Sequence, residues 1–232
     1  VLVLLVAPYV GAAVALLGKV FGDRRLFAWL APAPLFAGVV ALGRTYPTVR
    51  GGRILTYHMG GWVPPYGIPV SLDGLAWLVS ALIVLLTLLI SASALSNRRY
   101  TPRFFFFLMI LAGGMEGVAL AGDFFNLFVN FEIVALAAYV LIAWEREPAG
   151  LLAGFKYLVL SSVGILFFLF GVFLIYRDTG ALAMPHLTRT LAADPALAAS
   201  PAMHLALAAL CVGVGVRTAF IPFHTWLPEA HA

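Results

Sequence analysis

Five ionisable side chains lie inside or beside long apolar runs of this chain: Glu116, Glu132, Lys156, Arg217 and His224. A charged group at the centre of a bilayer costs about 2.5–3.5 kcal/mol even on the lenient insertion scales, so acids and bases there usually pair with one another or carry protons and ions. Glu132 lies deepest, because it is about 12 Å along a helix that starts at Phe124 and its side chain is too short to reach either surface. Proton transfer is therefore the first chemistry to consider.

Glu116 lies about as far before the turn at Gly122 as Glu132 lies after it. The two acids are expected at similar depth on neighbouring antiparallel helices, and the sequence leaves open whether they face each other. Each of these charges also has a simpler interpretation. Glu132 could hold two helices together by hydrogen bonding, and Lys156, near the start of its run, could extend its long side chain back to the surface.

The segment "GVGVRTAFIPFHTW" predicts a broken helix. Pro222 has no N–H and its ring clashes with the carbonyl of Thr218, so the helix should end just after Arg217. Non-helical backbone at membrane depth survives only where it is buried in protein or lines a wet cavity. A break beside Arg217, with His224 beyond it, therefore indicates an ion route; a simple kink and an interfacial histidine are the alternatives.

The elements that would position these side chains are transmembrane helices. Apolar residues make up 63% of the chain and charged residues only 10%, which excludes a soluble domain. Runs approaching the roughly 20 residues of a spanning helix recur, without the alternation of a barrel strand. The fold class is thus an all-α, polytopic transmembrane bundle of about seven helices: Val1–Leu17, Leu26–Leu42, Leu75–Leu95, Phe104–Ala121, Phe124–Trp144, Leu151–Tyr176 and Met203–Phe220.

Basic residues are scattered through the loops and form no patch that suits nucleic acid, although the formal net charge is +4. Their excess in the odd-numbered loops predicts a cytoplasmic position for those loops and an external amino terminus; the residues are Lys19, Arg24, Arg25, Arg98, Arg99, Arg103 and Arg146. The single cysteine, Cys211, excludes an intrachain disulfide, and no Cys/His cluster has metal-ligand spacing. We expect neither a metal nor a cofactor.

Local signals predict the connectors. The segment "RILTYHMGGWVPPYGIPVSLDG" favours an external hairpin or an extended loop that lies against the bundle. Ser71 or Asp73 can cap the next helix, Gly180 is a helix stop, and Ser200-Pro201 is a helix start. Because the chain begins with Val1 and ends without a polar tail, we expect it to be part of a longer protein.

Three segments carry a family resemblance: "GDFFNLFVNFEIVALAAYVLIAW", "FKYLVLSSVGILFFLFGVFLIYRDTGAL" and "RTAFIPFHTWLPEAHA". They resemble successive signatures of the antiporter-like membrane subunits, a family that joins subunits of Mrp-type cation/proton antiporters to the proton-pumping subunits of complex I and of membrane-bound hydrogenases. The resemblance covers most of the chain from Tyr57 onward.

The resemblance implies about fourteen helices with inverted five-helix repeats. Residues 1–102 would be the first three helices with their external loop, and residues 103–232 an incomplete first repeat. It also implies that Glu132 is the family's pairing glutamate, that Lys156 occupies a basic position on helix six, and that His224 is the histidine after the break. Arg217 stands where the family usually has lysine. Arginine keeps its proton, so it can hold Glu132 charged but cannot relay a proton itself.

The resulting prediction is a proton-translocating subunit, with sodium as an alternative ion, that uses Glu132, Lys156, Arg217 and His224, with Glu116 as a secondary candidate. The expected partners are other membrane subunits and the lipid bilayer, in the cytoplasmic membrane of a bacterium or archaeon. The competing interpretation is a structural anchor for a peripheral redox module. An enzyme with its own quinone site has no cofactor fingerprint in the sequence to support it, so any redox chemistry would belong to partner subunits.

Overall fold

The computed structural model describes residues 1–21, 25–62, 67–145 and 147–228, without the side chain of Lys19. Arg24, Arg146 and residues 63–66, which belong to the predicted loops, lie outside the described residues. The chain divides into two units, and each is described by itself: Val1–Met59 with Val70–Ala121, and Gly60–Pro69 with Gly122–Ala232.

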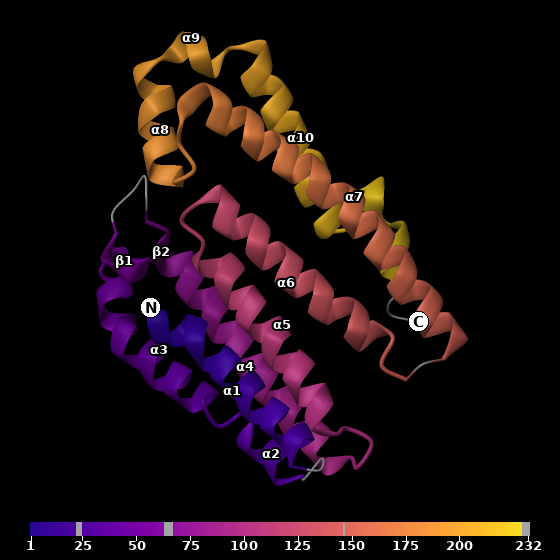
Figure 1. The fold of residues 1–232 in the computed structure, drawn as a ribbon. Helices are drawn as coiled ribbons and strands as arrows, with labels where there is room; N and C mark the ends of the chain where they lie inside the picture. Colours follow the sequence, from indigo (N-terminus) through magenta and orange to yellow (C-terminus); the bar gives the residue numbers. More distant parts are fainter. Residues whose placement is uncertain (22–24, 63–66, 146, 229–232) are drawn as a thin grey trace. The chain divides into compact units, whose positions relative to one another are not determined.

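The first unit is a helical bundle with a small hairpin at one end (Figure 1). Its helices pack in sequential and long-range pairs, with α1 against α5, α2 and α3, and α4 against α3 and α5. The predicted pairing of strands in this loop is confirmed, since two short strands form a two-stranded sheet; its external position stays a prediction. Its elements are α1 (Leu2–Val20), α2 (Leu26–Leu30), α3 (Leu35–Arg50), β1 (Leu55–His58), β2 (Pro69–Leu72), α4 (Gly74–Ser96) and α5 (Pro102–Leu120). A 3₁₀ turn, η1 (Met59–Gly61), and the first residue of β2 lie at the boundary with the second unit.

The second unit is built around the long helix α7, which packs against α6 on one side and α10 on another (Figure 1). Two short helices, α8 and α9, connect α7 to α10. The elements are α6 (Phe124–Ile142), α7 (Pro148–Thr179), α8 (Met184–Ala193), α9 (Pro195–Ala198), α10 (Pro201–Arg217) and a 3₁₀ turn η2 (Phe223–Trp226).

Several helix ends follow the local signals in the sequence. The Asp73 carboxylate accepts from the N–H of Ala76, and the Ser200 hydroxyl accepts from that of Met203. Both side chains satisfy backbone donors that have no partner within the helix. Gly180 ends α7 in the left-handed conformation, with φ of 63°, which glycine adopts without steric cost. The predicted caps at Asp73, Gly180 and Ser200 are confirmed.

The predicted spans correspond to apolar helices, with one difference in the second. The described residues contain five stretches long and apolar enough to cross a membrane, and Leu2–Gly18 and Pro201–Arg217 are shorter apolar helices. The span predicted over Leu26–Leu42 consists of α2 and α3 separated by a turn at residues 31–34. Pro32 and Pro34 lie in that turn, and proline disfavours helix both at its own position and at the preceding residue. The chain is a multi-pass integral membrane protein.

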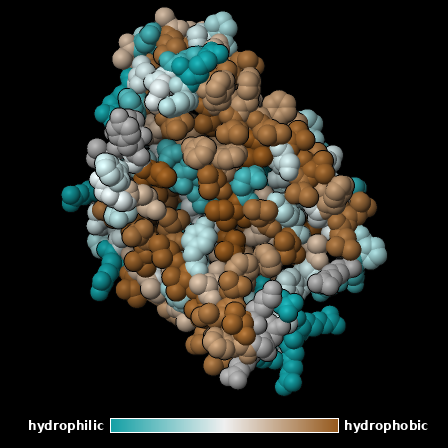
Figure 2. Space-filling model, viewed as in Figure 1, coloured by the Kyte–Doolittle hydropathy of each residue, from teal (hydrophilic) through white to brown (hydrophobic). Residues whose placement is uncertain are grey.

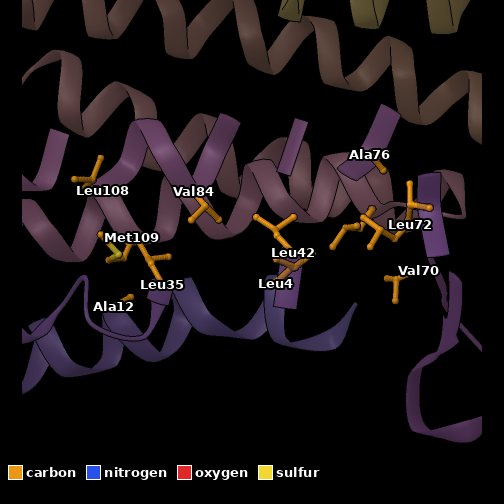
Figure 3. Close-up of a cluster of buried hydrophobic side chains, with 12 residues drawn as sticks. Leu4, Ala12, Leu35, Leu42, Val70, Leu72, Ala76, Val84, Leu108 and Met109 are labelled. Carbon is orange, nitrogen blue, oxygen red and sulfur yellow. The ribbon is translucent and has the colours of Figure 1, made fainter. Parts of the chain in front are cut away.

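The largest buried cluster of the first unit joins α1, α3, α4 and α5 (Figure 3). Leu4, Leu42 and Val84 lie at its centre, where side chains from three helices meet. Apolar side chains also predominate on much of the surface seen in Figure 2. A soluble protein does not expose such extended apolar surface, so this surface agrees with contact to lipid or to other membrane subunits.

Candidate functional site

An ion pair joins α6 to the end of α10 within the second unit. Nη2 of Arg217 donates to Oε1 of Glu132 at 2.5 Å, across 85 residues of sequence. The Arg217 side chain is 6% exposed and that of Glu132 is 36% exposed. The structure therefore brings together two of the five residues predicted from the sequence. The arginine side chain is more fully buried within the protein than that of the acid.

The other nitrogen atoms of the Arg217 guanidinium lack hydrogen-bond partners among the described residues. These atoms, Nε and Nη1, are both buried. The guanidinium carbon lies 5.7 Å from the ring centroid of Phe131, a cation–π distance. Because a buried cation with few hydrogen bonds depends strongly on its counter-charge, Glu132 is the main partner holding this charge in place.

Small residues let α7 and α10 approach closely near the ion pair. A Cβ on Gly213 would lie 2.6 Å from the Cβ of Phe168, and one on Gly164 would lie 2.7 Å from the Cβ of Val216. Such contacts are too short for any side chain, so only glycine permits this helix separation. The close packing fixes the rotation of α10 and with it the direction of Arg217, as small residues do between membrane helices.

The predicted break after Arg217 is present, because α10 ends at that residue and η2 begins only at Phe223. The indole N–H of Trp226 donates to the carbonyl of Val216 at 3.1 Å, a carbonyl in the last turn of α10 that also accepts from the backbone N–H of Ala219. The Trp226 ring also packs against Tyr157 on α7, with centroids 4.4 Å apart. Side chains thus hold the irregular segment against α7.

Lys156 and His224 are both exposed within this chain, on α7 and in η2 respectively. Neither residue takes part in the hydrogen bond or the salt bridge of the Glu132–Arg217 pair. Lys156 directly precedes Tyr157, and His224 lies two residues before Trp226, so both flank the aromatic contact between α7 and η2. The structure therefore places both residues next to the contact that holds η2 against α7.

Glu116 belongs to the first unit, on α5, and is fully buried. Its Oε2 atom accepts a hydrogen bond from the hydroxyl of Ser80 on α4 at 2.7 Å. Glu116 and Glu132 lie in different units, so the question of whether these two acids face each other stays open, as it was from the sequence.

Several further polar residues are buried in the structure and were not predicted from the sequence as site residues, among them Ser80, Asp123 and Asn130. Asp123 caps α6 by accepting from the N–H of Asn126 at 2.7 Å. Burial raises the pKa of the Asp123 carboxyl, and backbone N–H groups of Asn126 and Phe125 partly oppose the shift. The position of Asp123 directly before an apolar run is a helix-start signal that could have identified it.

No group of three or more His, Cys, Asp or Glu side chains that could hold a metal ion occurs in the part of the chain that the structure describes. Within the second unit, the chemistry that the arrangement offers is the making and breaking of the Glu132–Arg217 pair.

Comparison with known sequences places these features in a family. Residues 121–232 match the family described as NADH:quinone oxidoreductase/Mrp antiporter, TM. NADH-quinone oxidoreductase subunit N of Desulforudis audaxviator is 37% identical over 207 residues, which cover 86% of this chain and 40% of that protein. An Na(+)/H(+) antiporter subunit of Bacillus subtilis is 30% identical over 89% of this chain and 41% of its own length. The chain thus spans about two fifths of these relatives.

Solved structures agree with the sequence comparison. A chain of the archaeal membrane-bound sulfane sulfur reductase matches 98% of this chain with a TM-score of 0.85 and 28% identity, over 46% of its own length. A chain of the Mrp complex from Dietzia sp. DQ12-45-1b matches 98% of this chain with a TM-score of 0.83 and 25% identity, over 43% of its own length.

Proposed function

Because the chain belongs to the antiporter-like membrane subunits, we propose that it is an ion-translocating subunit of a multi-subunit membrane complex. Protons are the proposed ion, with sodium as the alternative. The relatives' names include a quinone oxidoreductase subunit and a sodium/proton antiporter subunit, so both kinds of complex are represented among its relatives.

The observation that carries the proposal is the ion pair between Glu132 and the buried end of α10. A carboxylate paired with a fixed cation is held in its charged form, and opening the pair releases that stabilisation. Arg217 cannot give up its proton at ordinary pH. In our proposal Arg217 therefore acts as a fixed charge, and the proton moves on Glu132 and on neighbouring titratable groups.

Lys156 and His224 are the basic residues that, in this proposal, take up and release protons along the translocation route. Both residues flank the contact between α7 and η2, and η2 follows the helix break that begins directly after Arg217. Their exposure in this chain leaves them open to water or to a neighbouring protein of the complex. Opening and closing of the Glu132–Arg217 pair would change the local field at both residues, which favours proton uptake in one state and release in the other.

A structural anchor is the second candidate. Its support is the arginine itself, because a non-titrating cation in a buried pair can lock two helices together without moving a proton. In that case α6 and α10 would form a rigid platform for a peripheral redox module, and transport would belong to other subunits.

The remaining proposals concern the whole protein. We place it in the cytoplasmic membrane of a bacterium or archaeon, with other membrane subunits as partners. Residues 1–102 form the proposed amino-terminal helices with their external loop, and residues 103–232 the proposed incomplete first repeat. The protein itself is proposed to carry no redox centre or other cofactor.

Dye-reported proton uptake in inverted membrane vesicles that hold the assembled complex tests the proposal. Glu132→Gln keeps the shape of the side chain and removes its charge, and we expect it to abolish the gradient at matched assembly. Glu145→Gln is the matched control, since Glu145 is exposed in the turn after α6. A normal gradient in Glu132→Gln would refute the transport role of the pair and favour the anchor.

A further inference from the structure

A second buried carboxyl lies in the first unit, on helix α5. Glu116 is 0% exposed, and Oε2 accepts from the Ser80 hydroxyl at 2.7 Å. Its other oxygen, Oε1, is buried without a hydrogen-bond partner among the described residues. An ionised carboxylate with one neutral donor would be poorly compensated at such a place. The carboxyl therefore needs a further partner, and a proton is the smallest one available.

The elements packed against α5 offer Glu116 no cation in the described structure. Helix α4 has no ionisable residue between Gly74 and Ser96, and α2 has none between Leu26 and Leu30. Helix α1 contributes Tyr9, whose ring lies against Gly113 one turn before Glu116. The basic residue of α1, Lys19, directly follows Gly18, which lies against Pro102 at the opposite end of α5 from Glu116.

The basic residue of α5 itself is Arg103, at the opposite end of the helix from Glu116. The two residues are thirteen positions apart, about 20 Å along the axis. Its guanidinium is therefore too far away to pair with this carboxyl. Glu116 differs in this respect from Glu132, which has a guanidinium partner at 2.5 Å.

One face of α4 continues from Ser80 as a row of buried hydroxyl groups. Ser80, Thr87 and Ser91 are all nearly inaccessible, and their spacing of seven and four residues places them on one side of the helix. Thr87 donates to the carbonyl of Ile83, whereas Ser91 Oγ has no partner among the described residues. The row covers about 16 Å along the helix. Hydroxyl groups both donate and accept, so such a row can hold water and pass protons.

We propose that Glu116 and Ser80 form a proton-binding site in the first unit, which exchanges protons with water along the hydroxyl face of α4 toward the Ser91 end. The site is separate from the Glu132–Arg217 pair and does not depend on the proposed function of that pair. Its ligand is the proton. A purely structural hydrogen bond between α4 and α5 is the outcome that would overturn it.

Infrared difference spectroscopy on membranes that hold the assembled complex reads the site directly. A carboxylic acid has a carbonyl band that shifts in D₂O, and a carboxylate lacks it. We expect such a band in the wild type, its loss in Glu116→Gln, and its retention in Glu132→Gln. Ser80→Ala should change the band's frequency, because that side chain donates to the carboxyl. Retention of the full wild-type band in Glu116→Gln would overturn the proposal.

Labelling with a hydrophobic carbodiimide is the second measurement and does not rely on the Glu116→Gln variant folding. The carboxylic O–H adds across a C=N bond, with oxygen bonding to carbon and the proton to nitrogen, and an acyl shift then gives a stable N-acylurea. Mass spectrometry should locate this adduct on Glu116 and find less of it as pH rises. An unmodified Glu116 across the whole pH series would overturn the proton site.

The rate of hydrogen–deuterium exchange at the carboxyl band tests the hydroxyl row. Ser91→Ala removes a buried hydroxyl and should slow exchange several-fold. Ser93→Ala is the matched control, because Ser93 lies on the exposed side of the same helix, and it should leave the rate unchanged. Equal rates in the two variants would refute the proposed route along α4.

Discussion

The Glu132–Arg217 pair permits a quantitative test through a double-mutant cycle. The variants are Glu132→Gln, Arg217→Met and the double variant. Gln keeps the size of the acid, and Met keeps most of the apolar stem of the arginine. The cycle isolates the interaction between the two side chains from their separate contacts with the rest of the protein.

The exposed fractions of the two side chains set the expected magnitudes. Removing one partner of a fully buried pair costs about 3–5 kcal/mol. Glu132 is 36% exposed, so water screens part of the interaction, and we expect a cost of about 2–3 kcal/mol for Glu132→Gln. Arg217→Met leaves the more exposed partner behind, which water can solvate, and should cost about 1–2 kcal/mol. The double variant should cost about as much as Arg217→Met alone.

Hydrogen exchange with mass spectrometry on the purified complex measures these changes locally. Amides in the last turns of α10 report the opening of the helix end that carries Arg217. A loss of about 2 kcal/mol would accelerate exchange there roughly 30-fold. Amides in α4, which belongs to the other unit, serve as the internal reference.

Additivity of the two substitutions would refute the expected coupling. If the losses of the two single variants sum to that of the double variant within about 0.5 kcal/mol, the side chains do not interact appreciably. The observed contact would then contribute neither to the stability of α10 nor to a switch built on it.

Gly213→Ala should lower the free energy of unfolding by about 1–3 kcal/mol, because the new Cβ would lie 2.6 Å from that of Phe168. Gly43→Ala is the control: its new Cβ would meet nothing within 4 Å, so the free energy of unfolding should stay unchanged or rise by up to about 1 kcal/mol. Equal melting temperatures would contradict the close packing of α7 and α10. The raised pKa of Asp123 means that the folded state keeps a proton which the unfolded state has released, so its contribution to stability falls as pH rises from the ordinary aspartate range through the raised value. Asp123→Asn should flatten this fall in a pH series of melting temperatures, and an unchanged slope would count against it. Arg217→Lys introduces a cation that can lose its proton at high pH, so the pH profile of proton uptake should gain an alkaline limb; an unchanged profile would show that the charge at this position is not coupled to transport.

The sequence alone determined the membrane class, the approximate spans and the local helix ends. Hydropathy acts over the length of a single helix, and caps and prolines act within one turn, so neither needs tertiary contacts. The side chains of Asp73 and Ser200 therefore cap the helices that follow them, and Gly180 ends α7 through its left-handed backbone conformation. The break after Arg217 follows from Pro222. The family, too, could be identified from three local segments.

Only the tertiary structure decided which buried charges meet. Glu132 contacts Arg217 across 85 residues, while Glu116 has a serine on α4 as its partner and Lys156 lies exposed on α7. The physical reason is the rotation of each helix about its axis. Spans that are apolar on all sides give little signal of which face turns inward, and that rotation is set by close contacts such as Gly213 against Phe168, which exist only once the helices have packed.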